Sequence, residues 1–275
     1  MDVTSRRPAV QRWWGVMETA SPQRRRGGRS RLGGVPTELP PDATRAGEQL
    51  SFGVGDGDVA TPQRREVLPA VVHIIGWLDA DAQRALVAQF RDWARPPAGL
   101  RHPRVPAGHL MSVQSVCLGW HWQPYVYSRF ADDTDGAPVK PMPANLADLA
   151  RDAVADAYAP DRSAADAFRP DAAIVNLYAP GAHLGLHQDG EEPASAPVVT
   201  ISLGDACVFR LAGVERRTGP FTDVLLHSGD LLVFGGPNRL IHHGVPKVLA
   251  GTAPTGLGLP PGRLSITVRE TGLDA

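Results

Sequence analysis

The stretch HLGLHQDGEE, residues 183–192, holds two histidines and three acidic residues within ten positions. Leu184 and Leu186 alternate with other residues there, a period of two that is typical of a β-strand. Side chains two residues apart in a strand project from the same face, so His187 and Asp189 are expected to point into one space. An imidazole and a carboxylate directed at one point suggest two ligands of a metal.

The residue pattern of the surrounding sequence changes at Ala172. From there on, short strand-like runs are separated by Gly, Pro, Asn and Asp: AAIVNLYA, HLGLHQD, PVVTISLG, CVFRLAG, DVLLHSG, DLLVFGG, LIHHGV and RLSITVRE. Many short strands that follow helical segments are typical of a double-sheet sandwich with helices packed outside. We therefore predict an α+β fold built on a jelly roll (a double-stranded β-helix) with outer supporting helices.

Two helices and a strand are predicted before Ala172. The run AVVHIIGWL, residues 70–78, is strand-like, and Asp79 is expected to cap the helix that follows it. A second helix is predicted from about Pro143 to Tyr158. The residues expected to face inward are Ala82, Leu86, Phe90 and Trp93 in the first helix and Leu146, Leu149, Ala153 and Ala157 in the second.

Residues 1–65 differ in composition from the rest of the 275-residue chain. They are rich in Arg, Gly, Pro and Ser without a sustained apolar period, which predicts a disordered tail followed by one domain over 66–275. The tail holds 11 Arg and 7 acidic residues, whereas the remainder holds 17 basic and 22 acidic residues. The overall net charge of -1 thus neither supports nor excludes nucleic-acid binding.

The composition also restricts the class of protein. A hydrophobic content of 43% and a charged content of 21% are ordinary for a globular protein, and no apolar run has the length of a membrane span. The N-terminal residues lack the apolar segment of a signal peptide, so we expect a cytoplasmic protein. Two cysteines, Cys117 and Cys207, are too few for a disulfide framework and lack the spacing of a zinc site.

A third metal ligand is needed beside His187 and Asp189. Two histidines and one carboxylate on one face of an octahedron form the site of non-haem Fe(II) oxygenases. His242 and His243 lie in a strand-like run and point to opposite faces, so only one of them can join the site. His183 would lie roughly 13 Å from His187 along an extended strand and is a weak candidate. His227 is a further candidate on sequence alone.

The run GRLSITVRE, residues 262–270, adds an independent signal. Arg263 and Arg269 share one strand face with Ser265, while apolar residues occupy the other face. Two arginines on one face are compatible with a solvated edge strand, or with two guanidinium groups directed at a ligand that carries two carboxylates. A metal triad beside a dicarboxylate site describes 2-oxoglutarate chemistry, whereas a His and an Asp alone are more often a surface pair.

Four motifs, in order, resemble the AlkB family of Fe(II)- and 2-oxoglutarate-dependent dioxygenases: NLYAPGAHLGLHQDGEE, PVVTISLGDACVFRL, HSGDLLVFGGPNRLIHHGV and GRLSITVRETG. The resemblance extends from about residue 110 to residue 272 and more faintly from Val67. It implies that the metal ligands are His187, Asp189 and His243, since the family places its histidine directly before a glycine. It further implies Fe(II), 2-oxoglutarate and O₂ as cofactor and cosubstrates.

The resemblance also assigns the residues around the metal. Arg263 would hold the distal carboxylate of 2-oxoglutarate, and Arg269 would lie near its metal-chelating end. Further cosubstrate contacts implied by the family are Asn176, Tyr178 and Ser265. Ser265 departs from the family, whose bacterial members carry Asn there. The shorter side chain loses one possible hydrogen bond, which puts the affinity for the cosubstrate in question.

The segment MSVQSVCLGWHWQPYVYS, residues 111–128, resembles the family's nucleotide-recognition lid, which we expect over about 105–142. By this resemblance Trp120 would stack on a flipped base, while Tyr125 and Tyr127 would contact base or backbone. On composition alone Trp120 is equally compatible with core packing. The remaining substrate contacts expected are Glu191 and Arg216. RHPRVPAGH, residues 101–109, and the pair Arg216–Arg217 are candidate phosphate-binding segments.

The function implied by the resemblance is oxidative dealkylation of N-alkylated bases such as 1-methyladenine and 3-methylcytosine. The expected partner is alkylated single- or double-stranded DNA, or RNA. We expect the protein to act as a monomer and not to bind a membrane. Two alternatives stay open on the sequence. One is a 2-oxoglutarate dioxygenase that acts on a protein or a small molecule, and the other is a catalytically silent jelly roll that binds nucleic acid.

Overall fold

The computed structural model describes residues 62–105 and 108–274. Most of the predicted tail, residues 1–65, lies outside the described residues. Its predicted end is wrong by a few positions, because strand β1 (Gln63–Leu68) already begins within it. This strand is mostly exposed and pairs in a hairpin with β2 (Val71–Ile75), where Gln63 lies opposite Ile75. An exposed, polar edge strand has no apolar period, so the sequence pattern did not reveal it.

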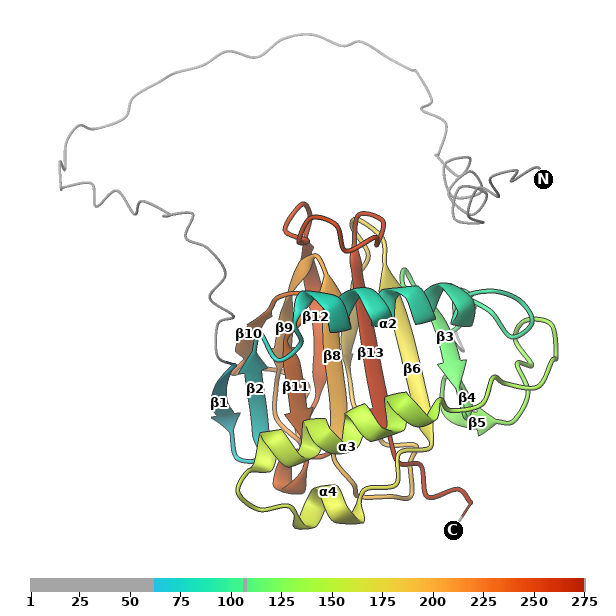
Figure 1. Ribbon diagram of the computed structural model, residues 1–275. Coiled ribbons are helices and arrows are strands. Elements are labelled where there is room, and N and C mark those ends of the chain that lie inside the picture. Colours follow the sequence, from blue (N-terminus) through green and yellow to red (C-terminus); the bar gives the residue numbers. More distant parts are fainter. Residues whose placement is uncertain (1–61, 106–107, 275) are drawn as a thin grey trace, which may run out of the picture. The chain divides into compact units, whose positions relative to one another are not determined.

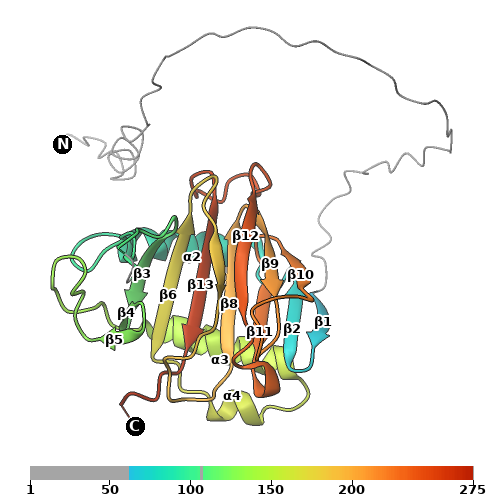
Figure 2. The ribbon, with the colours of Figure 1, turned by 180° about the vertical axis from the view of Figure 1, so that it is seen from behind.

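Two main antiparallel sheets form the described part of the chain (Figures 1 and 2). The larger has the order β1-β2-β11-β8-β13-β6-β3. Its remaining strands are β3 (Gln114–Leu118), β6 (Ala172–Tyr178), β8 (Val198–Gly204), β11 (Leu231–Phe234) and β13 (Arg263–Arg269). The smaller has the order β10-β9-β12-β7. Its strands are β7 (Leu184–His187), β9 (Ala206–Leu211), β10 (Thr222–Leu226) and β12 (His243–Leu249). All eight strand runs predicted from Ala172 onward are present, and the jelly-roll prediction is confirmed.

An apolar core lies where the two sheets face each other. Phe209 and Leu211 of the small sheet belong to the same buried cluster as Leu232 and Phe234 of the large sheet. Tyr178, at the end of β6, is 2% exposed and belongs to the same cluster. Burial of such side chains contributes roughly 1.5–3 kcal/mol each, so this core holds the two sheets together and supports the site between them.

Three α-helices are described, α2 (Ala80–Trp93), α3 (Ala144–Tyr158) and α4 (Ser163–Ala167). A short 3₁₀ helix, η1, covers Gly236–Asn238. Helices α2 and α3 lie on the outer face of the large sheet, opposite to the small sheet (Figures 1 and 2). Asp79 caps α2 as predicted, because its carboxylate accepts a hydrogen bond from the Ala82 N–H at 2.8 Å. The short helix α4 was not predicted.

The strand β13 lies in the interior of the large sheet. It pairs with β6 on one side and with β8 on the other, and all seven of its residues are buried. The alternative of a solvated edge strand is therefore excluded. The register places Ser265 opposite both Asn176 and Ser202, so polar side chains from three neighbouring strands lie side by side.

The predicted lid over 105–142 needs a correction. Strand β3 pairs with β6 and belongs to the large sheet. A separate two-stranded sheet follows, made of β4 (His121–Gln123) and β5 (Val126–Ser128), which is called the β4–β5 hairpin below. In the described residues, no helix is long and apolar enough to cross a membrane.

Candidate metal centre

His187 and His243 lie on adjacent strands of the small sheet and face Asp189. The last residue of β7, His187, is paired with the first residue of β12, His243. The Asp189 carboxylate lies two residues beyond β7, with its oxygens 3.6 Å from His187 Nε2 and 3.7 Å from His243 Nε2. One donor atom from each residue lies within 4.8 Å of the others. The predicted triad is thus brought together by the pairing of β7 with β12.

Backbone carbonyls orient both imidazole rings. His187 Nδ1 lies 3.0 Å from the Gly185 oxygen, and His243 Nδ1 lies 3.0 Å from the Ile241 oxygen. A carbonyl oxygen only accepts hydrogen bonds, so each Nδ1 must carry the hydrogen. The Nε2 lone pair of each ring is then free on the side of Asp189, as a metal ligand requires.

The Asp189 side chain has one oxygen that is satisfied by the protein and one that is not. Oδ1 accepts a charged hydrogen bond from Arg269 at 2.7 Å. Oδ2 is buried and has no hydrogen-bond partner among the described residues. A buried carboxylate oxygen without a partner is costly unless a cation binds it. The two histidine nitrogens and this oxygen therefore fit a divalent transition metal.

Electrostatics keep Asp189 and His243 in the protonation states that a metal needs. Burial alone would raise the pKa of Asp189, but the Arg269 guanidinium and the two imidazoles hold it well below its ordinary range. Burial lowers the pKa of His243 to about 4, against the opposing attraction of Asp189. At neutral pH the carboxylate is ionised and the His243 ring is neutral, which are the ligating forms.

Arg263 is 0% exposed. Its Nε donates to Ser202 Oγ at 3.1 Å, and its Nη2 donates to Ser265 Oγ at 3.3 Å. Nη1 has no partner in the part of the chain that the structure describes. The guanidinium carbon lies 5.1 Å from the centre of the Tyr178 ring. A buried arginine with a free N–H fits the carboxylate of an anionic cosubstrate.

Arg269 joins the candidate metal ligand to a second buried acid. Besides Asp189, its guanidinium binds Glu192 Oε1 at 3.0 Å and the Tyr127 hydroxyl at 2.9 Å. Glu192 also accepts from Arg239 at 3.1 Å, and Arg239 donates to the Asp189 carbonyl at 2.7 Å. The four residues Asp189, Arg269, Glu192 and Arg239 therefore form a closed circuit of charged hydrogen bonds. Sequence reasoning missed Glu192 and Arg239.

A cavity of about 520 Å³ opens above the triad. Its walls include His187 and Asp189, and they also include the predicted residues Asn176, Tyr125 and Glu191. Asn176 Oδ1 accepts a hydrogen bond from Ser115 Oγ at 2.5 Å, which holds the amide in place. A space of this volume accommodates a nucleobase-sized ligand. Tyr178, Ser265 and Arg263 are buried and do not line the cavity.

The structure does not bring Trp120 to the cavity. Its indole donates to Asp171 at 3.2 Å, and the Arg129 guanidinium stacks 3.6 Å from its ring. Trp122, two residues later, lines the cavity instead. The reason lies in Gly119, whose φ of +77° makes a turn before β4 and whose added Cβ would collide with the Asp171 carbonyl. The motif Gly-Trp marks this turn rather than the cavity wall.

Two further predicted substrate contacts, Tyr127 and Arg216, do not line the cavity. The Tyr127 hydroxyl is engaged with Arg269 and Glu192, so Tyr127 stabilises the site from behind rather than lining the cavity. Arg216 is exposed and closes a turn in which its carbonyl accepts from the Gly213 N–H at 3.2 Å. The next residue, Arg217, lines the cavity. Loop residues have no fixed parity, so sequence could not choose between the two arginines.

His242 lies at the cavity wall but outside the triad. It directly precedes β12, and its Nδ1 contacts the Gly213 carbonyl at 2.8 Å. The other candidate ligands, His183 and His227, are exposed and do not join the triad. The strand parity deduced from the sequence thus separates His242 from His243 correctly.

Four residues at the site were not predicted from the sequence: Trp122, Glu192, Arg239 and Ser202. Trp122 and Ser202 lie in strands β4 and β8, whereas Glu192 and Arg239 lie outside the strands. Only Glu192 had a usable signal, since it ends the acidic run that follows His187.

Comparisons with known proteins agree with this geometry. The model of the "2OG-Fe(II) oxygenase superfamily" matches residues 70–269. The "Alpha-ketoglutarate-dependent dioxygenase AlkB" of Escherichia coli is 36% identical over 214 residues, which cover 76% of this chain and 94% of that protein. The "DNA N(6)-methyladenine demethylase ALKBH1D" of Arabidopsis thaliana is 34% identical over 227 residues, which cover 76% of this chain but about half, 51%, of that protein.

One solved structure has the same fold. It is described as "The structure of OsALKBH1", with a TM-score of 0.66 and 31% sequence identity. The match covers 75% of this chain and 100% of that chain. The described fold therefore corresponds to the full length of that solved structure.

Proposed function

The chain belongs to the AlkB family of the 2OG-Fe(II) oxygenase superfamily, and from this premise we propose that it removes N-linked alkyl groups from bases in nucleic acid by oxidative dealkylation. Relatives named as a DNA N(6)-methyladenine demethylase and as a nucleic acid dioxygenase support a nucleic-acid substrate. That the chain acts as a monomer, and that it does so in the cytoplasm, stay predictions.

One observation carries the proposal. The buried Asp189 Oδ2 has no protein partner in the described residues and lies 3.7 Å from His243 Nε2, beside a cavity large enough for a base. We assign Fe(II) to His187, Asp189 and His243, and 2-oxoglutarate to the neighbourhood of Arg263 and Arg269. The free Nη1 of Arg263 supports the second assignment, because it offers a buried donor to a carboxylate.

When bound, Fe(II) together with 2-oxoglutarate and O₂ supplies the oxidising power that hydroxylates the alkyl carbon, while 2-oxoglutarate is converted to succinate and CO₂. One oxygen atom of O₂ enters succinate and the other enters the alkyl carbon. The hydroxylated product then loses an aldehyde and leaves the base with an N–H.

The protein's own residues orient the parts of this reaction. The Gly185 and Ile241 carbonyls hold the imidazole rings in the ligating tautomer. Arg269 neutralises Asp189 and fixes one of its oxygens, so that only the other faces the metal position. The cavity walls exclude water from the alkyl group and fix its position, which is where a protein contributes most to cofactor chemistry.

The cavity walls favour a cationic, flipped base. Trp122 and Tyr125 present aromatic side chains there, and Glu191 adds a carboxylate. A positively charged base such as 1-methyladenine or 3-methylcytosine is attracted by both kinds of group. Such lesions cannot pair normally, so extruding them from a duplex costs less than extruding an intact base. Arg217, on the same wall, offers a contact to the nucleic-acid backbone.

The experiment compares three oligonucleotide substrates, carrying 1-methyladenine, 3-methylcytosine or N6-methyladenine, each single- and double-stranded and as DNA and RNA. Iron-loaded protein with 2-oxoglutarate should release formaldehyde and succinate in equal amounts and restore the unmethylated base. The matched control is Asp189→Ala, which removes a metal ligand. Formaldehyde release from none of the substrates by folded, iron-loaded protein would shift the proposal to a protein or small-molecule substrate.

A further inference from the structure

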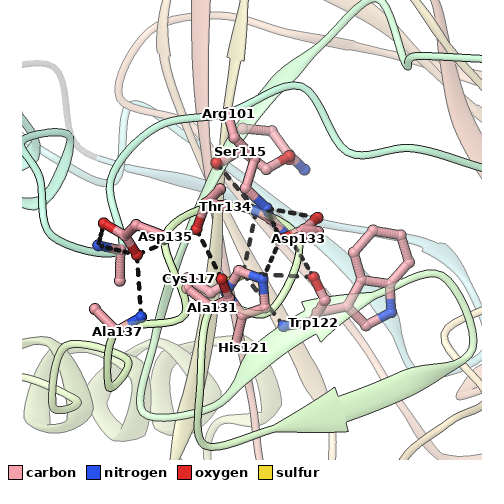
Figure 3. A network of polar contacts seen from close by, with 12 residues as sticks. Arg101, Ser115, Cys117, His121, Trp122, Ala131, Asp133, Thr134, Asp135 and Ala137 are labelled. Carbon is pink, nitrogen blue, oxygen red and sulfur yellow. Dashed lines mark hydrogen bonds and ion pairs between the residues drawn. The ribbon is translucent and has the colours of Figure 1, made fainter.

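A second cluster of buried ionisable side chains lies outside the metal centre, where β3 meets the β4–β5 hairpin (Figure 3). It consists of Arg101, Cys117, His121 and Asp133, called the Arg101 cluster below. The side chains of Arg101, His121 and Asp133 are 6%, 3% and 16% exposed. Charged groups are rarely buried to this degree unless they are paired.

An ion pair forms the centre of the cluster. Arg101 Nε lies 2.8 Å from Asp133 Oδ1 and 2.9 Å from Oδ2, and His121 Nε2 lies 2.6 Å from the same Oδ1 (Figure 3). Arg101 Nη1 donates to the Ser115 carbonyl at 3.1 Å, which ties the cluster to strand β3. These bonds occupy the Arg101 guanidinium, so Arg101 is not free to bind phosphate. The phosphate-binding role expected for the basic run 101–109 therefore does not extend to Arg101.

The remaining bonds of the cluster converge on the backbone of Trp122. The Trp122 N–H donates to Cys117 Sγ at 3.4 Å, and the Trp122 carbonyl accepts from Arg101 Nη2 (Figure 3). Both polar backbone groups of this residue are therefore bound by side chains of the cluster. The indole of Trp122 lines the cavity above the metal centre.

The opposite strand of the hairpin is held as well. Trp122 pairs with Tyr127, so their side chains lie on the same face of the hairpin. The Tyr127 hydroxyl binds Arg269 and Glu192 beside Asp189. The hairpin is thus fastened at Tyr127 to the metal centre and at Trp122 to the Arg101 cluster.

We propose that the Arg101 cluster is a positioning device that holds Trp122 in the wall of the substrate cavity, so that its residues set the affinity for the alkylated base without touching it. This proposal rests on the proposed function, since it takes Trp122 as a contact of the base. Arg101, Cys117, His121 and Asp133 act through Trp122 and are not catalytic residues.

The chemistry of Cys117 supports a role as hydrogen-bond acceptor. Burial raises the pKa of the Cys117 thiol, but the interaction with His121 and the positive charge of Arg101 outweigh it, and the pKa lies below its ordinary value. A sulfur with more anionic character is a better acceptor for the Trp122 N–H. Cys, His and Asp also form nucleophilic sites in some enzymes, but Cys117 and His121 are 1% and 2% exposed, which denies access to a substrate.

The test compares Cys117→Ala with Cys117→Ser in the iron-loaded full chain. Alanine leaves the Trp122 N–H without its acceptor, whereas serine keeps an acceptor of nearly the same shape. We expect Cys117→Ala to raise the KM for a methylated oligonucleotide about tenfold and Cys117→Ser to restore most of the loss. Decarboxylation of 2-oxoglutarate without oligonucleotide should stay unchanged in both, because it needs only the metal centre.

A second pair of variants tests the ion pair. Asp133→Asn removes the negative charge beside Arg101, and Asp223→Asn does the same to the ion pair of Asp223 with Arg210, an Arg–Asp pair outside the cavity wall with a distance of 2.7 Å. Asp133→Asn should raise the KM for the methylated oligonucleotide, whereas Asp223→Asn should leave it unchanged. If Asp133→Asn does not fold, the two Cys117 variants still decide the question.

Amide hydrogen exchange of residues 121–128 provides a readout without any substrate. Exchange there should be faster in Cys117→Ala than in wild type, and near wild type in Cys117→Ser. Unchanged amide exchange together with an unchanged KM in Cys117→Ala would overturn the proposal. An equal rise of KM in Cys117→Ala and Cys117→Ser would also overturn it. So would a loss of decarboxylation without oligonucleotide as large as the loss of oligonucleotide turnover. If wild type turns over no methylated oligonucleotide, the proposed function fails, and the exchange data alone decide whether the cluster positions the hairpin.

Discussion

His187 and His243 lie opposite each other in the antiparallel pairing of β7 with β12, with their ring centroids 4.4 Å apart. Directly opposite residues of an antiparallel pair point to the same face, so this register alone brings two imidazoles together. Asp189 completes the arrangement just beyond the end of β7. The metal centre is therefore a property of one strand pairing, and a register shift by one residue would destroy it.

The first prediction concerns the ligands. Alanine at His187, Asp189 or His243 should abolish turnover and weaken Fe(II) binding, measured by titration with Co(II) as a spectroscopic probe. His242→Ala is the control and should retain much of the activity, because its ring lies outside the triad and contacts the Gly213 carbonyl. An inactive His242→Ala beside an active His243→Ala would show that the ligand assignment is wrong.

The second prediction concerns the cosubstrate. Arg263→Ala should raise the KM for 2-oxoglutarate roughly 10–100-fold, since a carboxylate loses a charged hydrogen bond. Metal binding should be unchanged, because Arg263 does not contact the triad. Arg210→Ala serves as the control, since Arg210 pairs with Asp223 away from the cavity wall. A wild-type KM in Arg263→Ala would remove Arg263 from the cosubstrate site.

The third prediction separates two tryptophans. Trp122→Ala should lower kcat/KM for a methylated oligonucleotide about 10–100-fold, because a stacked base is worth ~1–3 kcal/mol. Trp120→Ala should affect stability more than kcat/KM, since Trp120 binds Asp171 and Arg129 rather than lining the cavity. Uncoupled decarboxylation of 2-oxoglutarate should survive both changes. A larger loss of kcat/KM in Trp120→Ala than in Trp122→Ala would contradict the placement of these side chains.

The fourth prediction concerns the buried circuit behind Asp189. Glu192→Ala leaves Arg239 and Arg269 without their shared anion, and the free energy of unfolding should fall by about 3–5 kcal/mol. Tyr127→Phe removes only a hydroxyl, and Glu192 keeps both arginines, so the expected loss is about 1–2 kcal/mol. Urea denaturation of both variants measures the difference. Losses of the same size would mean that the circuit is not held together by Glu192.

The fifth prediction concerns pH. Burial lowers the pKa of His243 to about 4, whereas an imidazole in the unfolded chain has a pKa near 6.5. Between these values the unfolded state binds more protons than the folded state, so the stability of the metal-free protein must fall as the pH is lowered through this window. From pH 7 to pH 5 the contribution of His243 is up to about 2 kcal/mol.

Urea denaturation at pH 7 and pH 5 checks this prediction when wild type is compared with His243→Gln, both free of metal. Glutamine does not titrate, so the loss of stability at pH 5 should be smaller in the variant. The same loss in both proteins would assign the pH dependence to other groups.

Much of the fold could be predicted because its signals are local. The period-two runs from Ala172 onward correspond to β6 through β13, and Asp79 caps α2 as its sequence position indicated. The triad was also within reach of the sequence. In a strand the side-chain parity is fixed by the backbone, so His187 with Asp189, and His243 rather than His242, follow from counting residues once the family resemblance is added.

Other features required the three-dimensional structure because parity is lost in turns. Gly119 adopts a φ of +77° and Tyr125 a φ of +73°, and after each of them the direction of the following side chains is reset. In this segment Trp122 reaches the cavity while Trp120 does not, and in the loop after β9 Arg217 lines the cavity while Arg216 does not. No count along the chain could have made these choices.

The sequence by itself determined which residues carry the chemistry, because strand periodicity and motif order are written in consecutive positions. Only the tertiary structure decided what supports them. The interior position of β13, the circuit through Glu192 and Arg239, and the Arg101 cluster behind Trp122 depend on contacts between residues far apart in the chain. A buried charge needs a partner of opposite charge, because leaving it unpaired costs free energy. That partner is a neighbour in the folded structure and need not be near in the sequence.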